Sequence, residues 1–381
     1  ALIICTGGGG TLYGFTTYSQ TVTGDGMALA YRAGLPLEDM EFLQFHPTGL
    51  VPSGILITEA CRGEGGYLRN SKGERFMEKY APNKMELAPR DLISRSEMTE
   101  IEEGRGFKGP GGLDYIHLDL THLGADRINE ALPLIREVCM EFNDLEPIDE
   151  PIPCRPVAHY SMGGVECDIN GATRIKGIWT AGEAACSSLH GANRLGSNST
   201  GECLVWGQIT GAEAARYCAT LSEPPALARE LLDEEEKRVF GDILGRSGPE
   251  NLYDLRKELR ATMDKYVGVY RTGPELEKAL EIIQGLKKRF ANITIPDKSR
   301  TYNTNLVHAL ELQNLIDLAE VTVTGALTRT ESRGGHARRD FPVRDDDKWL
   351  KHTLAFHTPS GPRLDYKSVT ITKWKPVERK Y

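Results

Sequence analysis

The stretch 177–207, GIWTAGEAACSSLHGANRLGSNSTGECLVWG, constrains the fold of this chain more than any other. Its first residues, IWTA, form a short apolar run ended by a glycine-containing turn, which predicts a buried parallel strand that stops at a ligand crevice. Ser199 stands three residues before Glu202, just ahead of an apolar run, and this spacing predicts a capping box at the start of a helix. Free backbone N–H groups at a helix start attract negative charge, and Arg194 lies in the loop before it. The stretch therefore predicts an anion-binding site.

The composition limits the class of protein. With 381 residues, 40% of them hydrophobic and 26% charged, the chain is long enough for two or three globular domains. A formal net charge of −8 argues against a nucleic-acid partner. No run of eighteen apolar residues exists, so we expect no segment that spans a membrane by itself. The eight cysteines show no CxxC pair and no zinc-like spacing, which predicts reduced, mostly buried thiols in an intracellular protein and no metal site.

The blocks GEAAC and HGANRLGSNS, with the helix expected after them, resemble the flavoprotein subunit of the succinate dehydrogenase and fumarate reductase family, a relative of L-aspartate oxidase. They belong to a set of family-like blocks that occur in family order over most of the chain. The resemblance implies FAD as cofactor and an α/β FAD-binding domain, incomplete here, with an inserted α+β capping domain, a C-terminal helical bundle and a small C-terminal strand region. The expected ranges are 1–37 and 157–222 for the two parts of the FAD-binding domain, 38–156 for the capping domain, 223–339 for the bundle and 340–381 for the C-terminal region.

The chain opens on ALIIC followed by TGGGG, which predicts a strand that runs into a glycine-rich loop and resembles the family's ATGG strand and loop. In full-length members that loop follows a long dinucleotide-binding half. No GxGxxG follows a strand here, and no acidic residue follows about 20 positions later, so we expect a fragment without that half. From the residues alone, TGDG favours a turn with an Asx cap. The resemblance instead assigns FAD contacts to Thr6, Gly7, Asp25, Glu183, Ser199 and Thr200.

Two histidines and a threonine are candidate substrate ligands. FLQFHPTG places His46 before a proline, where the backbone is extended and a helix pattern must stop. A solitary histidine is more often structural. The resemblance of QFHPTG, TEACRGEGG and HYSMGG to family blocks implies, however, that His46, Thr58 and His159 bind a dicarboxylate. With Arg194 they offer two clusters, Arg194 with His159 for one carboxylate and His46 with Thr58 for the other.

Glu59, Arg62 and Arg90 are the catalytic candidates. From the residues alone, Glu59 and Arg62 fit a surface ion pair worth about 0 to 1 kcal/mol, and Arg90 in APRDLISR fits a bidentate carboxylate clamp. The resemblance implies a proton relay in which Arg90 is the donor and Glu59 and Arg62 stand behind it. Free arginine has a pKa above ~12, so we expect proton loss from Arg90 to be transient and confined to a closed, dry site.

The remaining sequence patterns predict secondary structure and domain organisation, and they add no further candidate site residues. Over 38–156 we expect short strands, turns and loops, and the three prolines of 151–156 predict a stiff hinge back to the first domain. Apolar residues at helical spacing after the FAD-binding domain predict a small helical bundle. The dense charges of 329–347 predict a solvated connection, and strands are expected over 354–356 and 368–372.

The implied reaction is the interconversion of succinate and fumarate, with a hydride moving to or from FAD and Arg90 giving or taking the proton. The implied partners are an iron–sulfur subunit that takes the electrons and, through it, a membrane anchor. The chain would then be intracellular and peripheral on the cytoplasmic face of the membrane. Met162 in HYSMGG favours this branch, since aspartate oxidases more often resemble HYxCGG. Two alternatives stay open, an L-aspartate oxidase and an inactive fragment that is unable to hold FAD.

Overall fold

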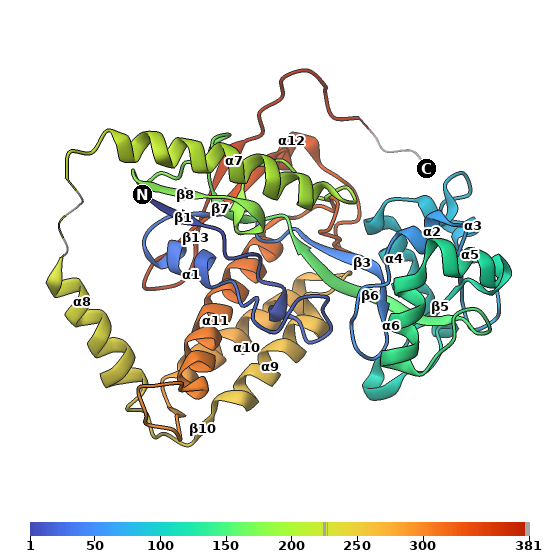
Figure 1. Cartoon of the computed structure of the whole chain (residues 1–381), viewed down its shortest axis with the longest axis horizontal. Coiled ribbons are helices and arrows are strands. Elements are labelled where there is room, and N and C mark those ends of the chain that lie inside the picture. The colour runs from blue at the N-terminus through green and yellow to red at the C-terminus, as the bar shows by residue number, and fades with distance from the viewer. Residues whose placement is uncertain (224–225, 227, 378–381) are drawn as a thin grey trace. The chain divides into compact units, whose positions relative to one another are not determined.

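The computed structural model describes residues 1–223, 226 and 228–377, which form two compact units. The first unit comprises Ala1–Gly14, Tyr18–Phe42 and Ser161–Val369, and the second comprises Phe15–Thr17, Leu43–Tyr160 and Thr370–Tyr381. Figure 1 shows the elements of both. Residues 224, 225 and 227 of the predicted bundle, and 378–381 of the predicted C-terminal region, lie outside the described residues.

Parallel strands hold the start of the first unit together. β1 (Leu2–Ile4) pairs in parallel with β8 (Ile178–Thr180), so the strand predicted before GEAAC is confirmed. Because the carboxyl ends of the two strands lie at one edge, the glycine-rich loops that follow them both start there. A five-stranded sheet runs in the order β13-β12-β2-β7-β9. Its strands are β2 (Leu37–Glu38), β7 (Gly164–Glu166), β9 (Ala185–Cys186), β12 (Lys351–Phe356) and β13 (Arg363–Ser368).

The sequence predicts strands over 354–356 and 368–372, which can be compared with β12 and β13. β12 and β13 are antiparallel, with Phe356 opposite Arg363 and Lys351 opposite Ser368. The strand expected over 354–356 is confirmed within β12. The strand expected over 368–372 is wrong, because β13 ends at Ser368, where its pairing with Lys351 ends.

A helical bundle fills the second half of the first unit, as the helical spacing predicts. Its α10 packs against both α9 and α11 (Figure 1). The helices of this unit are α1 (Asp25–Arg32), α7 (Asn198–Ala219), α8 (Arg229–Glu236), α9 (Leu252–Tyr266), α10 (Gly273–Phe290), α11 (Thr304–Thr328) and α12 (Asp346–Trp349). The side chains of Asn251, Thr272 and Asn303 accept backbone N–H groups at the starts of α9, α10 and α11, which satisfies donors that a helix start otherwise leaves free. Three of the apolar residues at helical spacing, Leu252, Leu255 and Leu259 of α9, are buried.

The predicted start of α7 is wrong. The helix begins at Asn198, directly after Ser197, whose φ of 64° is left-handed and whose side chain makes no cap hydrogen bond. Ser199 therefore lies inside the helix. Glu202 does not form a capping box, because its Oε2 is 2.7 Å from Nε2 of His190.

The second unit is built on a four-stranded sheet in the order β3-β6-β5-β4. Its strands are β3 (Leu43–Leu50), β4 (Tyr67–Arg69), β5 (Ile116–Asp119) and β6 (Ile152–Ser161), the last residue of which belongs to the first unit. Its helices are α2 (Ala60–Gly63), α3 (Met77–Tyr80), α4 (Arg90–Glu100), α5 (Gly124–Ala131) and α6 (Pro133–Asn143). The sequence analysis expected short strands, turns and loops here, and it missed α4, α5 and α6.

Two physical reasons account for the differences in the second unit. α5 and α6 are short and amphipathic, so each contributes only a few apolar residues, such as Ile128 and Cys139, to the core. The hinge predicted for 151–156 is wrong, because these prolines continue into β6, where Pro153 lies opposite His117 of β5. A proline is tolerated at a strand position that donates no ladder hydrogen bond.

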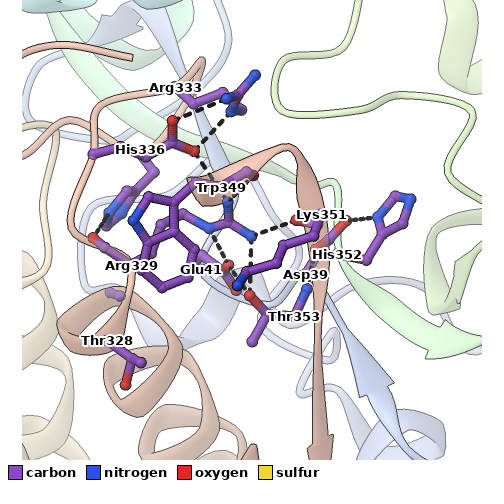
Figure 2. Close-up of polar contacts among 12 residues, drawn as sticks. Asp39, Glu41, Thr328, Arg329, Arg333, His336, Trp349, Lys351, His352 and Thr353 are labelled. Atoms are coloured by element: carbon purple, nitrogen blue, oxygen red, sulfur yellow. Dashed lines mark hydrogen bonds and ion pairs between the residues drawn. The ribbon is translucent and has the colours of Figure 1, made fainter. Parts of the chain in front are cut away.

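The solvated connection predicted for 329–347 is wrong in its first half. Arg329, Glu331 and His336 are each 0% exposed. Nε of Arg329 donates to Oε1 of Glu41 at 2.7 Å, and its Nη1 donates to Oε1 of Glu331 at 3.0 Å (Figure 2). Charge density therefore marks a buried network here, because each charge has a partner within the fold.

Two further expectations concern the chain as a whole. The eight cysteines are free and five of them are buried, as predicted. Among the described residues, no helix combines the length and the apolar character that crossing a membrane requires.

Candidate active site

Arg90 and Glu59, both in the second unit, are paired directly. Arg90 is the first residue of α4, and its Nε and Nη2 lie 2.9 and 2.8 Å from Oε2 of Glu59. Its Nη1 donates to Oε1 of Gln44 at 3.0 Å, so the guanidinium is held from two sides. The side chain of Arg90 is 11% exposed and that of Glu59 is 47% exposed. The pair therefore joins a nearly buried cation to a carboxylate that water can reach.

Arg62 lies near the same carboxylate oxygen of Glu59. Its Nη2 is 3.8 Å from Oε2 of Glu59, and its side chain is 0% exposed. Nη1 donates to the carbonyl of Glu86 at 2.6 Å. Burial lowers the pKa of Arg62, although the nearby Glu59 charge opposes this. The three residues predicted to form a proton relay thus lie in the order Arg90, Glu59 and Arg62.

His46 and His159 lie together because β3 and β6 are neighbours in the sheet. Their ring centroids are 5.0 Å apart at an interplanar angle of 64°. The N–H of Thr48 donates to Nδ1 of His46 at 3.2 Å, so a neutral His46 carries its proton on Nε2. Nδ1 of His159 is 2.9 Å from Oγ1 of Thr17. Hydrogen bonds therefore orient both rings.

Thr58 precedes α2, and the N–H of Ala60 donates to its Oγ1 at 3.4 Å. The side chain is half-buried. It completes the group of candidates in the second unit, which consists of His46, Thr58, Glu59, Arg62, Arg90 and His159. Arg194 and the candidate cofactor residues belong to the first unit.

The first unit offers a cradle for a phosphate-bearing cofactor at the ends of β1 and β8. Thr6 is exposed and Gly7 has a φ of 77°, a left-handed conformation that favours glycine. A Cβ at Gly8 would lie 2.4 Å from Oε1 of Glu183, so a side chain there would force the carboxylate of Glu183 to move. Ser199 and Thr200 lie in the first turn of α7, which has no side-chain cap. Uncapped N–H groups beside a glycine loop fit a phosphate.

Asp25 and Glu183 are both engaged with groups of the first unit itself. Oδ1 of Asp25 accepts from Oγ1 of Thr23 at 3.0 Å and from Nδ2 of Asn314 at 2.6 Å. Oε1 of Glu183 accepts from the N–H of Ser161 at 2.8 Å and from the hydroxyl of Tyr18. Burial raises the pKa of Glu183 to about 7, although these hydrogen bonds oppose the rise.

Arg194 is 3% exposed, and its Nη1 donates to the carbonyl of Leu195 at 3.2 Å. The loop that carries it also holds His190, which is paired with Glu202 of α7. The loop is thus fixed to the helix that follows it.

Two further polar side chains lie in the same unit as the predicted relay, and the sequence pattern did not point to them. Gln44 is buried and accepts from Arg90. Glu97 is fully buried on α4, seven residues after Arg90. A spacing of seven puts two residues on one helix face, so a correct prediction of α4 would have pointed to Glu97.

Comparison with known families matches most of the chain. Residues 1–200 match the profile of an FAD binding domain, and residues 256–381 match the profile of the C-terminal part of fumarate reductase flavoproteins. The chain is 47% identical to the fumarate reductase flavoprotein subunit of Mycobacterium tuberculosis over 396 aligned residues, which cover 100% of this chain and 68% of that protein. It is 42% identical to the corresponding subunit of Escherichia coli K12, covering 100% of this chain and 65% of the relative. It is 44% identical to the succinate dehydrogenase flavoprotein subunit of Rickettsia bellii, covering 97% and 64%.

Solved structures give the same result. Escherichia coli quinol fumarate reductase superposes with a TM-score of 0.95 at 41% identity over 99% of this chain and 67% of that chain. Mycobacterium smegmatis Sdh1 superposes with a TM-score of 0.83 at 35% identity over 97% and 62%. The chain thus spans about two thirds of the length of the relatives that it matches. The matched FAD binding domain identifies FAD as the cofactor of this fold.

Proposed function

The chain belongs to the family of fumarate reductase and succinate dehydrogenase flavoprotein subunits, and we propose that it carries the residues that interconvert fumarate and succinate. One observation carries the proposal. Arg90 and Arg62 both lie near one carboxylate oxygen of Glu59, with Nη2 atoms at 2.8 and 3.8 Å. That arrangement suits a proton relay, because a group that gives up a proton has a second source of protons next to it.

The two units have different tasks in this proposal. The second unit is the inserted α+β capping domain and carries the proton chemistry. The first unit contains the FAD-binding part, the helical bundle and the small C-terminal strand region. FAD supplies the acceptor or donor of a hydride at one carbon of the substrate.

Thr6, Gly7, Ser199 and Thr200 are the residues proposed to hold the cofactor, since they line the uncapped start of α7 and the glycine loop. Asp25 and Glu183 are also proposed to contact FAD, but with only part of their carboxylate oxygens. Their carboxylates already accept hydrogen bonds from the first unit, so they shape the loops and offer their remaining oxygen lone pairs.

The substrate is a small dicarboxylate. In the second unit, His46, Thr58 and His159 supply a proton on Nε2, a hydroxyl and a second imidazole. Arg194 is proposed as a further carboxylate ligand on the resemblance of its loop, and a guanidinium suits bidentate binding of a carboxylate.

Arg90 exchanges the proton at the other reacting carbon. In fumarate reduction the guanidinium of Arg90 gives its proton to that carbon, and a proton passes from Arg62 through Glu59 to restore it. In succinate oxidation each transfer is reversed. The burial of Arg62 favours this role, because a cation removed from water holds its proton less tightly.

The electrons are proposed to leave through an iron–sulfur subunit bound to a membrane anchor, which would place the chain peripherally on the cytoplasmic face of a membrane. A solved relative is a quinol fumarate reductase. An L-aspartate oxidase is the second candidate of the sequence analysis. Oxidation of L-aspartate with oxygen as acceptor would identify an L-aspartate oxidase. Met162 argues against this function.

The test is Arg90→Lys in the FAD-loaded enzyme, with Arg95→Lys as the matched control. Arg95 lies on the same helix and pairs with Asp91 at 3.1 Å, away from Glu59. We expect Arg90→Lys to lower kcat by roughly 10²- to 10⁴-fold with a small change in KM, the size of a lost proton transfer. Arg95→Lys should retain turnover. Unchanged turnover in Arg90→Lys would contradict the donor role, and a flavin absorption band that survives desalting verifies loading in each variant.

A further inference from the structure

A pocket of about 570 Å³ lies within the first unit, where α9 and α11 meet the loop that contains Gly14 and Gln20. Three cationic residues of α9, Arg256, Lys257 and Arg260, line it. The proposed reaction uses none of these residues. The volume lies within the range of roughly 300 to 1,000 Å³ that is typical of pockets for small organic ligands. The pocket is therefore a candidate for a second binding site.

The lining of the pocket contains more positive than negative charges. Arg256 and Arg260 are four residues apart on α9, so their side chains project from the same face of the helix. Like charges at this spacing repel each other. Lys257 is exposed and adds a third positive charge. The carboxylates of the lining are those of Asp264 and Glu311, so the three cations are not fully compensated.

Both guanidinium groups are held mostly by neutral acceptors. Arg260 donates from Nε to the carbonyl of Thr11 at 3.0 Å and from Nη2 to Oε1 of Gln20 at 2.8 Å. Arg256 donates from Nη2 to the carbonyl of Gln20 at 3.4 Å and from Nη1 to Oε2 of Glu311 at 3.1 Å. Nε of Arg256 is buried and has no hydrogen-bond partner among the described residues. The two cations are thus fixed in position before any ligand arrives.

The protonation of Arg260 agrees with this excess of positive charge. Burial lowers the pKa of Arg260, and the neighbouring charge of Arg256 lowers it further, although Asp264 and Glu311 oppose the change. Asp264 also accepts the N–H of Gly14 at 3.0 Å. An opposite charge close to a cation favours its charged form. A bound anion would therefore supply the compensation that the pocket lacks.

Arg289 of α10 shows how the same bundle compensates an arginine outside the pocket. Its Nε lies 2.9 Å from Oε1 of Glu250, and its Nη1 lies 2.7 Å from Oε2 of Glu258. The hydrogen bonds of these two carboxylates raise the pKa of Arg289. The pKa of Arg260 is shifted in the opposite direction. The incomplete compensation is thus a property of the pocket and not of the bundle as a whole.

An aromatic pair lies in the same pocket, one helical turn before Arg256. The ring centroids of Tyr253 and His308 are 5.7 Å apart at an interplanar angle of 79°. The hydroxyl of Tyr253 accepts from Nδ2 of Asn305 at 2.7 Å and lies 3.2 Å from Nδ1 of His308, so the ring is held at its hydroxyl end. Tyr253 is 44% exposed. Its ring therefore offers a fixed, flat surface on which another ring can stack.

We propose that this pocket binds a nucleoside diphosphate, with the phosphates on Arg256, Lys257 and Arg260 and the base on the ring of Tyr253. Guanidinium groups bind phosphate oxygens through paired N–H donors. An inorganic phosphate would balance the charges but would leave the aromatic surface uncovered. A nucleoside would cover that surface but would leave the charges as they are. The proposal is independent of the proposed reaction, because it uses neither the relay nor the candidate cofactor residues.

The test is equilibrium dialysis of labelled ADP against the FAD-loaded full chain, and it needs no turnover. Arg260→Gln should weaken ADP binding roughly tenfold or more, the size of a lost hydrogen bond to a charged group. Lys257→Gln removes an exposed charge with less risk to the fold and should weaken binding by a smaller factor. Its matched control is Lys265→Gln, which makes the same change on α9 outside the pocket and should leave binding unchanged.

Pyrophosphate and adenosine separate the two parts of the proposed ligand. ADP should bind more tightly than either, and Tyr253→Ala should weaken ADP roughly tenfold while leaving pyrophosphate binding as it is. ADP bound elsewhere, at the FAD cradle included, would not respond to Arg260→Gln or Lys257→Gln. No ADP binding, or ADP binding that both of these variants leave unchanged, would overturn the proposal. Pyrophosphate binding as tight as that of ADP would also overturn it, because the ring would then have no part in the site.

Discussion

Two buried arginines, one in each unit, are treated by the fold in opposite ways. In the first unit all five N–H donors of Arg329 have partners (Figure 2). Its guanidinium lies over the rings of Phe42 and Trp349 at 4.8 and 5.1 Å. In the second unit Nε and Nη2 of Arg62 have no hydrogen-bond partner, and the ion pair of Nη2 with Glu59 is long, at 3.8 Å. Neither carboxylate oxygen of Glu97 has a hydrogen-bond partner. A satisfied charge is held in one state, whereas an unsatisfied one is free to change its protonation. The difference is the one expected if the Arg329 site is structural and the Arg62 site has the proposed chemical role.

The contrast between the two arginines predicts the largest effect on stability for a substitution of Arg329. Arg329→Met should lower the free energy of unfolding by about 3 to 5 kcal/mol, because Glu41 and Glu331 would stay buried without their cation. Urea unfolding of the full chain measures it. The control is Arg363→Ala, since the side chain of Arg363 is 58% exposed and its ion pair is long, at 4.0 Å; its effect should be below about 0.5 kcal/mol. A loss of less than about 1 kcal/mol in Arg329→Met would mean that the network does not stabilise the fold.

Arg62→Met should cost much less, although Arg62 is as deeply buried. The substitution removes one hydrogen bond to the carbonyl of Glu86 but also removes a poorly compensated buried charge. We expect a loss of no more than about 1 to 2 kcal/mol in the same urea experiment. If Arg62→Met destabilises the chain as much as Arg329→Met, the two sites are alike and the comparison fails.

A substitution of His352 should have the smallest effect on the free energy of unfolding, and this effect should depend on pH. Its Nδ1 is 2.6 Å from Oδ2 of Asp39 and 3.1 Å from Oε1 of Glu38. Burial alone would lower the pKa of His352, but the hydrogen bond and charge of Asp39 outweigh burial and raise it. Burial and the Asp39 charge also raise the pKa of Glu38, although Lys367 opposes this. For both groups the folded state binds more protons than the unfolded state, so stability falls as pH rises.

The stabilisation by His352 is complete below the unfolded pKa of about 6.5 and is lost as pH rises through the higher folded value. Urea unfolding at pH 6 and pH 9 should show this decrease in the wild type. His352→Gln should reduce the decrease, and the control His308→Gln, which alters a partly exposed histidine, should leave it as it is. An equal pH dependence in the wild type and His352→Gln would show that Asp39 does not favour a charged imidazole.

Local patterns in the sequence predicted the parts of the fold that depend on local forces. The apolar run before GEAAC is the strand β8, and the leucines at helical spacing are buried in the bundle. The proposed relay of Arg90, Glu59 and Arg62 followed from blocks whose resemblance to a family was specific. The structure brings these three together within one unit.

Long-range partners explain what the sequence could not tell. Arg329 pairs with Glu41, 288 positions earlier, so composition made its surroundings look solvated. Glu202 looked like part of a capping box because its partner, His190, lies upstream in an irregular loop. Glu97 was missed since a lone glutamate in a polar helix gives no sign of burial. For Arg329 the decisive fact is a contact 288 positions away, which no short window of sequence contains.

The interleaving of the two units also sets an order of assembly during synthesis. Residues 43–160 leave the ribosome as one uninterrupted run, whereas the first unit cannot close until its third stretch has followed. Glu41 must wait for Arg329 throughout that time. Domains generally fold as units while the chain is being made, so the second unit has its sheet in place while the first is still an open chain. The first unit is therefore the later of the two to close, after residues 161–369 have been translated.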